Sequence, residues 1–256
     1  MTDPGRRLAP PTAITAEQMA DLDRIMLDEL GIAPLQLMEI AGHAVATFTR
    51  DRLLDGDASG KRVLALAGNG GNGGDALVAA RLLTAWGAMV TIVIARPPDV
   101  HSGLAAHQLD IARRWGISVQ TADDDTALDP AGAAADLILD GLLGFSLHGD
   151  PRGATATLIE RANAHDAPTL AIDLPSGLEA TTGVIRTPCI RARTTLTLAM
   201  TKTGLLTPGA RTVLGDLWVA DIGVPPVAFG RVGLSFASAP FATGAFHHVF
   251  DAGGVG

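Results

Sequence analysis

The stretch "LALAGNGGNGGDALVAARLL", residues 64–83, joins an apolar run to a helical run through a glycine-rich turn. Gly68, Gly70 and Gly73 satisfy the G-x-G-x-x-G pattern that opens the helix of dinucleotide-binding βαβ units. Asp75, however, places a carboxylate at the expected start of the helix, where it would cap free N–H groups and compete with a phosphate. The turn also lacks the Gly-Lys-Ser/Thr ending of a Walker A loop. It therefore predicts a strand, a loop and a helix, but neither standard phosphate-binding loop.

The sequence on both sides of this turn alternates short apolar runs with helical runs. We expect strands at residues 62–67, 88–95, 117–120, 136–140, 168–173, 194–199 and 216–223. Helices are expected between them at residues 75–86, 103–115 and 153–164. Two more precede the first strand: one opens with the capping-box spacing of Thr15 and Gln18, and one starts near Pro34. Apolar strands separated by helices predict a doubly wound α/β domain with a parallel sheet covered on both faces.

The ends of the chain carry weaker signals. We expect residues 1–13 to form a flexible leader, because two arginines there are not followed by the apolar core of a secretory signal. Residues 14–230 form the predicted domain, and residues 231–256 form a tail whose structure the sequence leaves open. The adjacent pair His247 and His248 is expected to be solvated rather than to bind a metal, since neighbouring side chains point in different directions.

Composition narrows the class of protein. The chain has 256 residues, a formal net charge of −8 and a single cysteine, Cys189. The acidic balance, without a cluster of Lys and Arg, argues against a nucleic-acid partner. The longest apolar runs are far shorter than the ~20 residues of a membrane-spanning helix, so no membrane partner is expected. One cysteine permits no intramolecular disulfide, and together with the missing signal it predicts a cytoplasmic protein.

Unusual polar residues follow three of the predicted strands. Asn72 comes after the strand at 62–67, Asp140 closes the strand at 136–140, and Asp173 closes the strand at 168–173, three residues before Ser176. The carboxyl ends of parallel strands meet at one edge, where α/β sheets bind their ligands. Amide, carboxylate and hydroxyl oxygens are hard donors that suit Na⁺, K⁺, Mg²⁺ or Ca²⁺ better than zinc. The alternative is that the two aspartates only cap the turns that follow them.

Five segments in this order resemble the NAD(P)H-hydrate epimerase family. They are "LMEIAG" (37–42), "GNGGNGGDALVAAR" (68–81), "DGLLGFSLHGDPRG" (140–153), "DLPSGLEATTG" (173–183) and "TKTGLLTPGARTVLGDLWVADIGVP" (201–225). The resemblance implies a Rossmann-like, three-layer α/β/α sandwich that is often a homodimer. It also implies an isomerase of metabolite repair, which interconverts the S and R forms of hydrated NADH and NADPH. A separate repair dehydratase would then act on the product.

The resemblance also implies which residues form the site. The substrate-binding residues fall on Gly71, Asn72, Gly73, Gly74 and Asp75, on Gly144, Phe145, Ser146, Leu147, His148, Gly149 and Asp150, and on Asp173. The potassium ligands fall on Asn72, Asp140 and Ser176, in agreement with the hard oxygen donors noted above. Asp173 is the residue we expect to move the proton that makes hydroxide a tolerable leaving group.

Departures from the family pattern keep a second function open. Gly71 stands where the family has an asparagine, and Ile40 replaces the asparagine of its "MENAG" segment, so two polar groups near the site are lost. The same fold could then serve as a catalytically weakened nucleotide-binding or protein-interaction module. Lys202 also matches a family position, either as a solvated lysine or as a phosphate contact, and Phe145 is a candidate to flank a nicotinamide or adenine ring.

Overall fold

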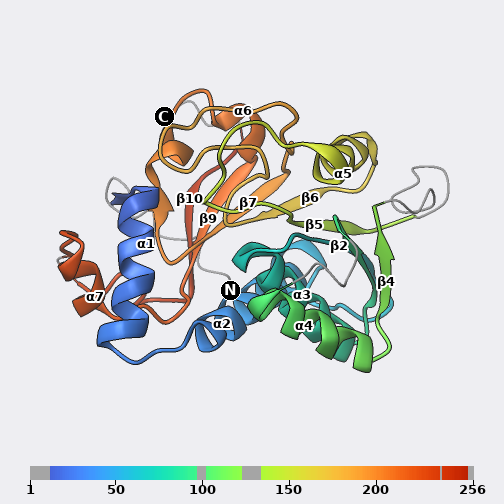
Figure 1. Ribbon diagram of the computed structural model, residues 1–256, viewed down its shortest axis with the longest axis horizontal. Coiled ribbons are helices and arrows are strands. Elements are labelled where there is room, and N and C mark those ends of the chain that lie inside the picture. The colour runs from blue at the N-terminus through green and yellow to red at the C-terminus, as the bar shows by residue number, and fades with distance from the viewer. Residues whose placement is uncertain (1–11, 97–101, 123–133, 237, 253–256) are drawn as a thin grey trace.

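The computed structural model describes residues 12–96, 102–122, 134–236 and 238–252 (Figure 1). Its centre is an eight-stranded sheet in the order β10-β9-β7-β6-β5-β2-β3-β4. These strands are β2 (Arg62–Ala67), β3 (Met89–Ile94), β4 (Ser118–Thr121), β5 (Leu137–Gly141), β6 (Thr169–Ile172), β7 (Thr194–Leu198), β9 (Asp216–Ala220) and β10 (Phe246–Phe250). All neighbours are parallel except β10, which runs antiparallel to β9. A separate two-stranded sheet pairs β1 (Ala13–Ile14) with β8 (Thr201–Lys202).

The helices lie between the strands along the chain, as the alternating pattern predicts. They are α1 (Ala16–Arg24), α2 (Pro34–Phe48), α3 (Gly71–Ala85), α4 (Gly103–Arg114), α5 (Gly153–Ala164), α6 (Arg211–Leu214) and α7 (Pro226–Arg231). π-Helical turns at Ile25–Glu29 and Thr49–Leu53 extend α1 and α2, and a short 3₁₀ helix covers Thr203–Leu206. The capping box predicted for the first helix is formed: Thr15 accepts a hydrogen bond from the Gln18 N–H, and Gln18 accepts one from the Thr15 N–H.

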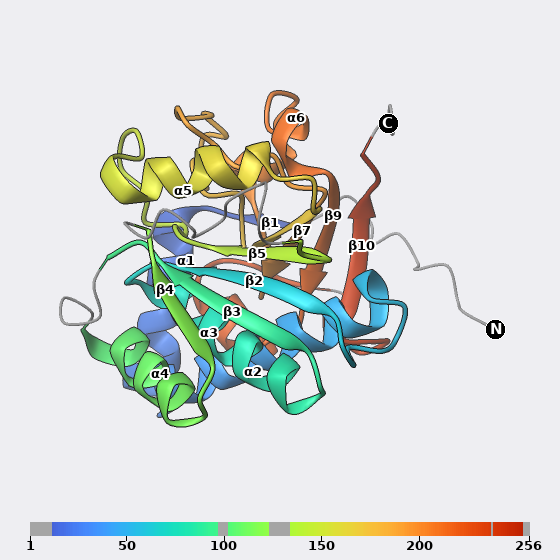
Figure 2. The ribbon, with the colours of Figure 1, turned by 90° about the vertical axis from the view of Figure 1, so that its right-hand side faces the viewer.

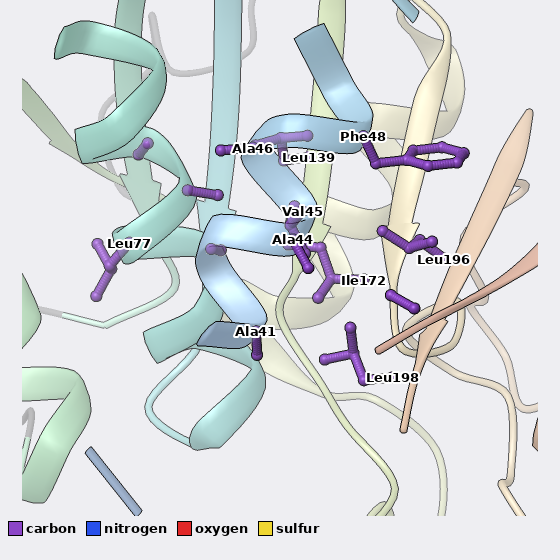
Figure 3. Close-up of a cluster of buried hydrophobic side chains, with 14 of the residues drawn as sticks. Ala41, Ala44, Val45, Ala46, Phe48, Leu77, Leu139, Ile172, Leu196 and Leu198 are labelled. Carbon is purple, nitrogen blue, oxygen red and sulfur yellow. The ribbon is translucent and has the colours of Figure 1, made fainter. Parts of the chain in front are cut away.

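The molecule has three layers, with α5 on one face of the sheet and α2, α3 and α4 on the other (Figure 2). Leu158 and Ile159 of α5 pack against Leu64 and Ile138 of the sheet in one buried cluster. The larger cluster lies under α2 and α3; Figure 3 shows part of it, including Val45, Phe48, Leu77, Leu139, Ile172, Leu196 and Leu198. The predicted fold class, a doubly wound α/β sandwich with two N-terminal helices, is confirmed.

The strand order reverses between β2 and β5. The chain passes outward from β2 through β3 to β4, and then returns to the other side of β2 to build β5, β6 and β7. Ala67 and Gly141, at the carboxyl ends of β2 and β5, are neighbours in the register. Ligands of open α/β sheets bind at such a switch point, because the loops that leave the two strands diverge there. Asn72 and Asp140 belong to these two segments.

The prediction that a helix begins at Asp75 was wrong. Helix α3 begins at Gly71 with Gly70 as its N-cap residue, so Asp75 lies beyond the first turn and does not cap it. Glycine is a poor helix former, which is why the pattern suggested a longer loop. Tertiary packing overrides this preference at the glycine positions.

The glycines are needed because the start of α3 touches its neighbours through the backbone. A Cβ atom at Gly73 would collide with the carbonyl oxygen of Gly68, and a Cβ atom at Gly74 would collide with the Met38 side chain of α2. A Cβ atom at Gly68 would collide with the carbonyl oxygen of Leu142. Gly71 differs, since a Cβ atom there would meet nothing within 4 Å. Close packing therefore accounts for Gly68, Gly73 and Gly74 but not for Gly71.

The C-terminal segment returns to the sheet. His247 lies in β10, is buried, and stacks on Phe241 with ring centroids 5.3 Å apart. The expectation of a solvated histidine pair was therefore wrong for His247, because pairing of β10 with β9 carries it into the interior. The boundary at residue 230 stays a prediction, and residues 1–11 of the expected leader lie outside the described part of the chain. Within the described ranges, none of the helices combines the length and the apolar character that crossing a membrane requires.

Two glycines of α3 offer a matched test of this packing. Gly73→Ala forces a methyl group against the Gly68 carbonyl, and overpacking of this kind destabilises a protein by about 1–3 kcal/mol or more. Gly71→Ala adds the same methyl group in open space, and we expect it to leave the free energy of unfolding nearly unchanged. Urea denaturation of both variants measures the difference. Equal stability of the two variants would contradict the packing described here.

Candidate active site

A cavity of about 400 Å³ lies beside the switch point of the sheet. Its polar lining comes from six side chains on five segments far apart in sequence: Asp23, Asn72, Asp75, Ser146, Asp173 and Lys202. Its apolar lining includes Met19, Leu37, Met38, Ala41, Leu142, Phe145, Leu198 and Ile222. A mostly apolar cavity with a few convergent polar groups is typical of a small-molecule site.

Only some of the residues that the resemblance implies for the substrate line this cavity. Those that do are Gly71, Asn72, Asp75, Gly144, Phe145, Ser146 and Asp173. Gly73 and Gly74 are buried in the packing of α3, and the residues 147–150 follow the lining part of their loop. In that loop, Asp150 accepts a hydrogen bond from the Thr187 N–H at 3.3 Å.

The three predicted cation ligands are brought together next to the cavity. Ser176 donates hydrogen bonds from its N–H and its hydroxyl to the two carboxylate oxygens of Asp140, at 2.8 and 2.6 Å. The Leu143 N–H donates to the Ser176 hydroxyl at 2.9 Å, and the Asn72 amide donates to the Leu143 carbonyl at 2.7 Å. Asp140 and Ser176 are completely buried. Burial raises the pKa of Asp140 to about 6, against the opposing effect of the hydrogen bonds from Ser176 and Leu142.

Asn72 has one side-chain atom that the protein leaves without a partner. Its Nδ2 donates to the carbonyls of Leu143 and Ile172, at 2.7 and 2.9 Å, and these two acceptors fix the orientation of the amide. Its Oδ1 is buried and receives no hydrogen bond from any described residue. Buried acceptors normally have a partner, so this oxygen is available to a cation or to a donor from a bound molecule.

The atoms that could bind a cation at this site are hard oxygen ligands. Within the described residues, His, Cys, Asp and Glu side chains form no group of three that could hold a metal ion. What the site offers is one amide oxygen, one carboxylate, one hydroxyl and the Leu143 carbonyl. A donor set with a single charge suits a monovalent cation better than zinc, which prefers nitrogen and sulfur ligands.

Asp173 forms a buried ion pair with Lys202. Its backbone has a φ of +66°, in the left-handed region, and its Oδ1 accepts hydrogen bonds from the Lys202 ammonium, from the Thr197 hydroxyl at 3.2 Å and from the Leu198 N–H at 3.0 Å. Lys202 is 1% exposed and also donates to the Leu198 carbonyl at 2.8 Å. The interpretation of Lys202 as a solvated lysine was therefore wrong: β8 carries it inward to neutralise Asp173. The Oδ1 atom of Asp173 is therefore engaged as a hydrogen-bond acceptor within the protein.

Sequence reasoning missed one charged residue of the cavity lining, Asp23. It lies on α1 one turn after Met19, and both face the cavity. Asp23 keeps part of its surface exposed at the cavity mouth. Partial burial of its carboxyl group raises its pKa to about 6, while Lys202 lowers the pKa and Asp173 raises it. The available signal was a carboxylate placed four residues after a buried methionine, on the edge of the apolar stripe of the helix.

Asp75 is more strongly affected than Asp23. Its pKa is raised well above the usual value, first by burial and then by the negative charges of Asp173 and Asp23, while Lys202 acts in the opposite direction. Its carboxyl group receives no hydrogen bond from the described part of the chain, which leaves the burial uncompensated. The side chain therefore faces the cavity as a carboxyl group that readily holds a proton.

The two departures from the family pattern differ in their effect. Gly71 lies at the cavity edge, so its missing side chain leaves the rim more open. Ile40 is 43% exposed on α2 and is not among the residues that line the cavity. The expectation that Ile40 removes a polar group beside the site therefore finds no support in the structure.

The ion pair can be tested by removing one partner. Lys202→Met leaves the Asp173 carboxylate buried and unpaired, and breaking a buried pair in this way costs about 3–5 kcal/mol. The double variant Asp173→Asn/Lys202→Met removes both charges and should recover most of that loss. Urea denaturation of the single and double variants gives the coupling energy. A Lys202→Met variant as stable as the parent chain would show that the pair does not stabilise the fold.

Known proteins with similar sequences indicate the family to which this chain belongs. The family model described as YjeF-related protein N-terminus matches residues 34–204. The NAD(P)H-hydrate epimerase of Dehalogenimonas lykanthroporepellens is 38% identical over 233 residues, which is 91% of this chain and 91% of the relative. The epimerase of Levilactobacillus brevis is 39% identical and matches 83% of this chain and 94% of its own. A bifunctional NAD(P)H-hydrate repair enzyme of Moorella thermoacetica is 39% identical, but the match takes up only 40% of its length.

A solved structure supports the fold. The crystal structure of yeast ynu0, YNL200c, superposes with a TM-score of 0.75 and 21% sequence identity, covering 93% of this chain and all of the yeast chain. The resemblance inferred from the five sequence segments is thus confirmed by the family model, by full-length relatives and by the fold. This chain belongs to the NAD(P)H-hydrate epimerase family, whose shared domain is the YjeF-related N-terminal domain.

Proposed function

We propose that this protein interconverts the S and R forms of NADH and NADPH that are hydrated at carbon 6 of the nicotinamide ring. The observation that carries the proposal is the cavity at the switch point, where carboxyl groups and one ion pair face an apolar pocket. The names of relatives that match most of the chain support the same conclusion. A catalytically weakened binding module is not favoured, because the loss at Ile40 lies outside the cavity lining.

The cavity supplies what the reaction needs around the ring. Loss of hydroxide from carbon 6 leaves a positive charge that the ring nitrogen shares, and return of water from the other face gives the opposite form. Asp173 lines the cavity, and the bonds from Lys202, Thr197 and Leu198 to its Oδ1 would hold the Asp173–Lys202 ion pair in a fixed position beside that cation. Such preorganised charges are a large part of enzymatic rate enhancement. Phe145 is the candidate to flank the ring.

Potassium fits the oxygen donors next to this cavity. The ligands would be the orphaned Oδ1 of Asn72, the carboxylate of Asp140, the hydroxyl of Ser176 and the carbonyl of Leu143. When bound, the ion would neutralise the buried Asp140 carboxylate and hold the loops after β5 and β6 against the start of α3. These loops contribute Gly144, Phe145 and Asp173, so the ion would order part of the cavity wall.

The remaining features of the proposal come from the resemblance. The residues 147–150, a homodimeric state, a separate dehydratase as the next enzyme and a cytoplasmic location stay predictions. Gly71 is the first residue of α3 and lies at the cavity edge with its surroundings open. A helix N-terminus attracts phosphate through its free N–H groups and its dipole, which supports a position for the pyrophosphate near Gly71.

The direct test follows the two hydrate forms. Purified R-enriched NADH hydrate is incubated with the protein, and chromatography measures the approach to the S/R equilibrium. We expect equilibration well above the spontaneous rate, since positioned acid–base groups contribute about 10²–10⁴-fold. Tight binding of the hydrate without acceleration would support the binding module instead and would overturn the proposed activity.

A second test concerns the cation. Potassium at tenfold excess over its Kd should stabilise the folded protein by about 1.4 kcal/mol, visible as a higher melting temperature in KCl than in choline chloride of equal ionic strength. Asp140→Asn should lose this difference, because the only charged ligand is gone. A control variant, Asp136→Asn, removes an exposed carboxylate that pairs with Arg62 outside the site and should keep the potassium effect. Equal melting temperatures in both salts would exclude the cation site.

A further inference from the structure

Two carboxyl groups of the cavity have no part in the function described so far. Asp75 projects from α3 and Asp23 from α1, and both line the space that also contains Asp173 and Lys202. Neither forms an ion pair among the described residues, whereas the Asp173 carboxylate is neutralised by Lys202. The cavity thus holds three carboxyl groups around one ammonium group.

We infer that Asp75 is the acid that protonates the departing hydroxyl group of the hydrated ring, and that Asp23 is the positioning residue that keeps Asp75 in its acid form. This inference rests on the proposed epimerase function and extends it to the source of the proton. It also changes the role expected from the sequence, in which Asp173 moves the proton: the Asp173–Lys202 ion pair lies beside the ring, and Asp75 delivers and recovers the proton.

The exchange of the hydroxyl group at carbon 6 needs no reactant other than water. The Asp75 carboxyl group gives its proton to the hydroxyl oxygen on carbon 6, the carbon–oxygen bond breaks with its electron pair on oxygen, and water leaves. The ring nitrogen donates its lone pair to carbon 6, which gives a planar cation. Water then adds to the other face of carbon 6 and returns a proton to the Asp75 carboxylate. No oxidant or reductant is consumed, and the products are the opposite epimer and the original acid.

The surroundings of the two side chains favour Asp75 over Asp173 as the proton donor. Asp173 accepts three hydrogen bonds on one oxygen, one of them from an ammonium group, so this carboxyl group is already engaged within the protein. Asp75 has the opposite environment: burial and the charges of Asp173 and Asp23 raise its pKa well above the usual value. A general acid works in its protonated form, and a raised pKa extends the pH range over which that form is present.

Asp23 acts on Asp75 through its charge. The charged groups that face Asp75 are Asp23 of α1, Asp173 after β6 and Lys202 of β8. Of these, Asp23 is the one at the solvent-open mouth of the cavity, and it is not tied to Lys202 by a direct contact. Its carboxylate therefore disfavours ionisation of Asp75 and raises the pH up to which Asp75 still carries a proton.

The first experiment replaces the acid. Asp75→Asn keeps the shape of the side chain, and removing an uncompensated buried carboxyl group should not unfold the protein, which a melting curve checks. We expect the S/R equilibration rate to fall by at least about 10²-fold while the Kd for NADPH, a stable probe of the same pocket, stays unchanged. Incorporation of ¹⁸O from labelled water into the hydrate should fall in parallel. An Asp75→Asn variant that epimerises at the parent rate would overturn the inference.

The second experiment measures the epimerisation rate as a function of pH. This profile would not shift if the role of Asp23 were only structural. The parent rate should decline as pH rises through the pKa of Asp75, because only the protonated acid works. In Asp23→Asn the decline should begin at lower pH, since a negative charge that favours protonation has been removed. Asp21→Asn is the matched control: Asp21 is exposed on the same helix near Arg24, and its removal should leave the profile in place. An unshifted profile in Asp23→Asn would exclude the role of Asp23.

The outcomes distinguish this inference from the proposed function. If the parent protein does not accelerate S/R equilibration, the proposed function fails and the assignment of the acid fails with it. If the parent protein is active and Asp75→Asn is equally active, only the assignment of the acid fails. If Asp173→Asn, rather than Asp75→Asn, abolishes the decline at high pH, then Asp173 is the acid and the roles are reversed.

Discussion

The site depends on how closely the first turn of α3 approaches the carboxyl ends of β2 and β5. Gly68, Gly73 and Gly141 have no room for a Cβ atom, because backbone atoms and, at Gly141, also the Ala76 side chain occupy that place. This contact sets the position of Asn72, whose amide reaches the carbonyls of Leu143 and Ile172. One backbone-to-backbone contact thus joins the segments that supply the oxygen donors and part of the cavity wall. A glycine-rich loop here serves packing first and ligand binding second.

The charges of the cavity follow from the same arrangement. Asp140 lies inside β5 and is held by Ser176, whereas Asp173 leaves the neighbouring strand β6 in a left-handed conformation and turns to Lys202. Two aspartates that look alike in the sequence therefore have different surroundings, one among neutral hydrogen-bond donors and one beside an ammonium group. This difference in surroundings, rather than residue type, decides which groups can carry charge and which can carry a proton.

Most of the fold could be predicted from the sequence because periodicity is a local property. The strand at residues 62–67 and the helix at residues 153–164 appear with the expected bounds. The polar residues at the strand ends were found in the same way, since parallel strands place their carboxyl ends together. What could not be predicted depends on distant segments. The early start of α3 depends on contacts with Met38 and Leu142, and the burial of Lys202 depends on a partner 29 residues away. Asp23 joins the cavity only once α1 has packed, and His247 is buried only once β10 has paired with β9.

The small sheet of β1 and β8 connects the two ends of the domain. Ala13 and Ile14 pair with Thr201 and Lys202, so the strand that leads into α1 is hydrogen-bonded to the strand that carries the buried lysine. The pairing therefore links the segment that carries Asp23 to the strand that carries Lys202, although these two residues lie far apart in the sequence. The two ends of the domain thus meet at the cavity, where one supplies a carboxyl group and the other an ammonium group.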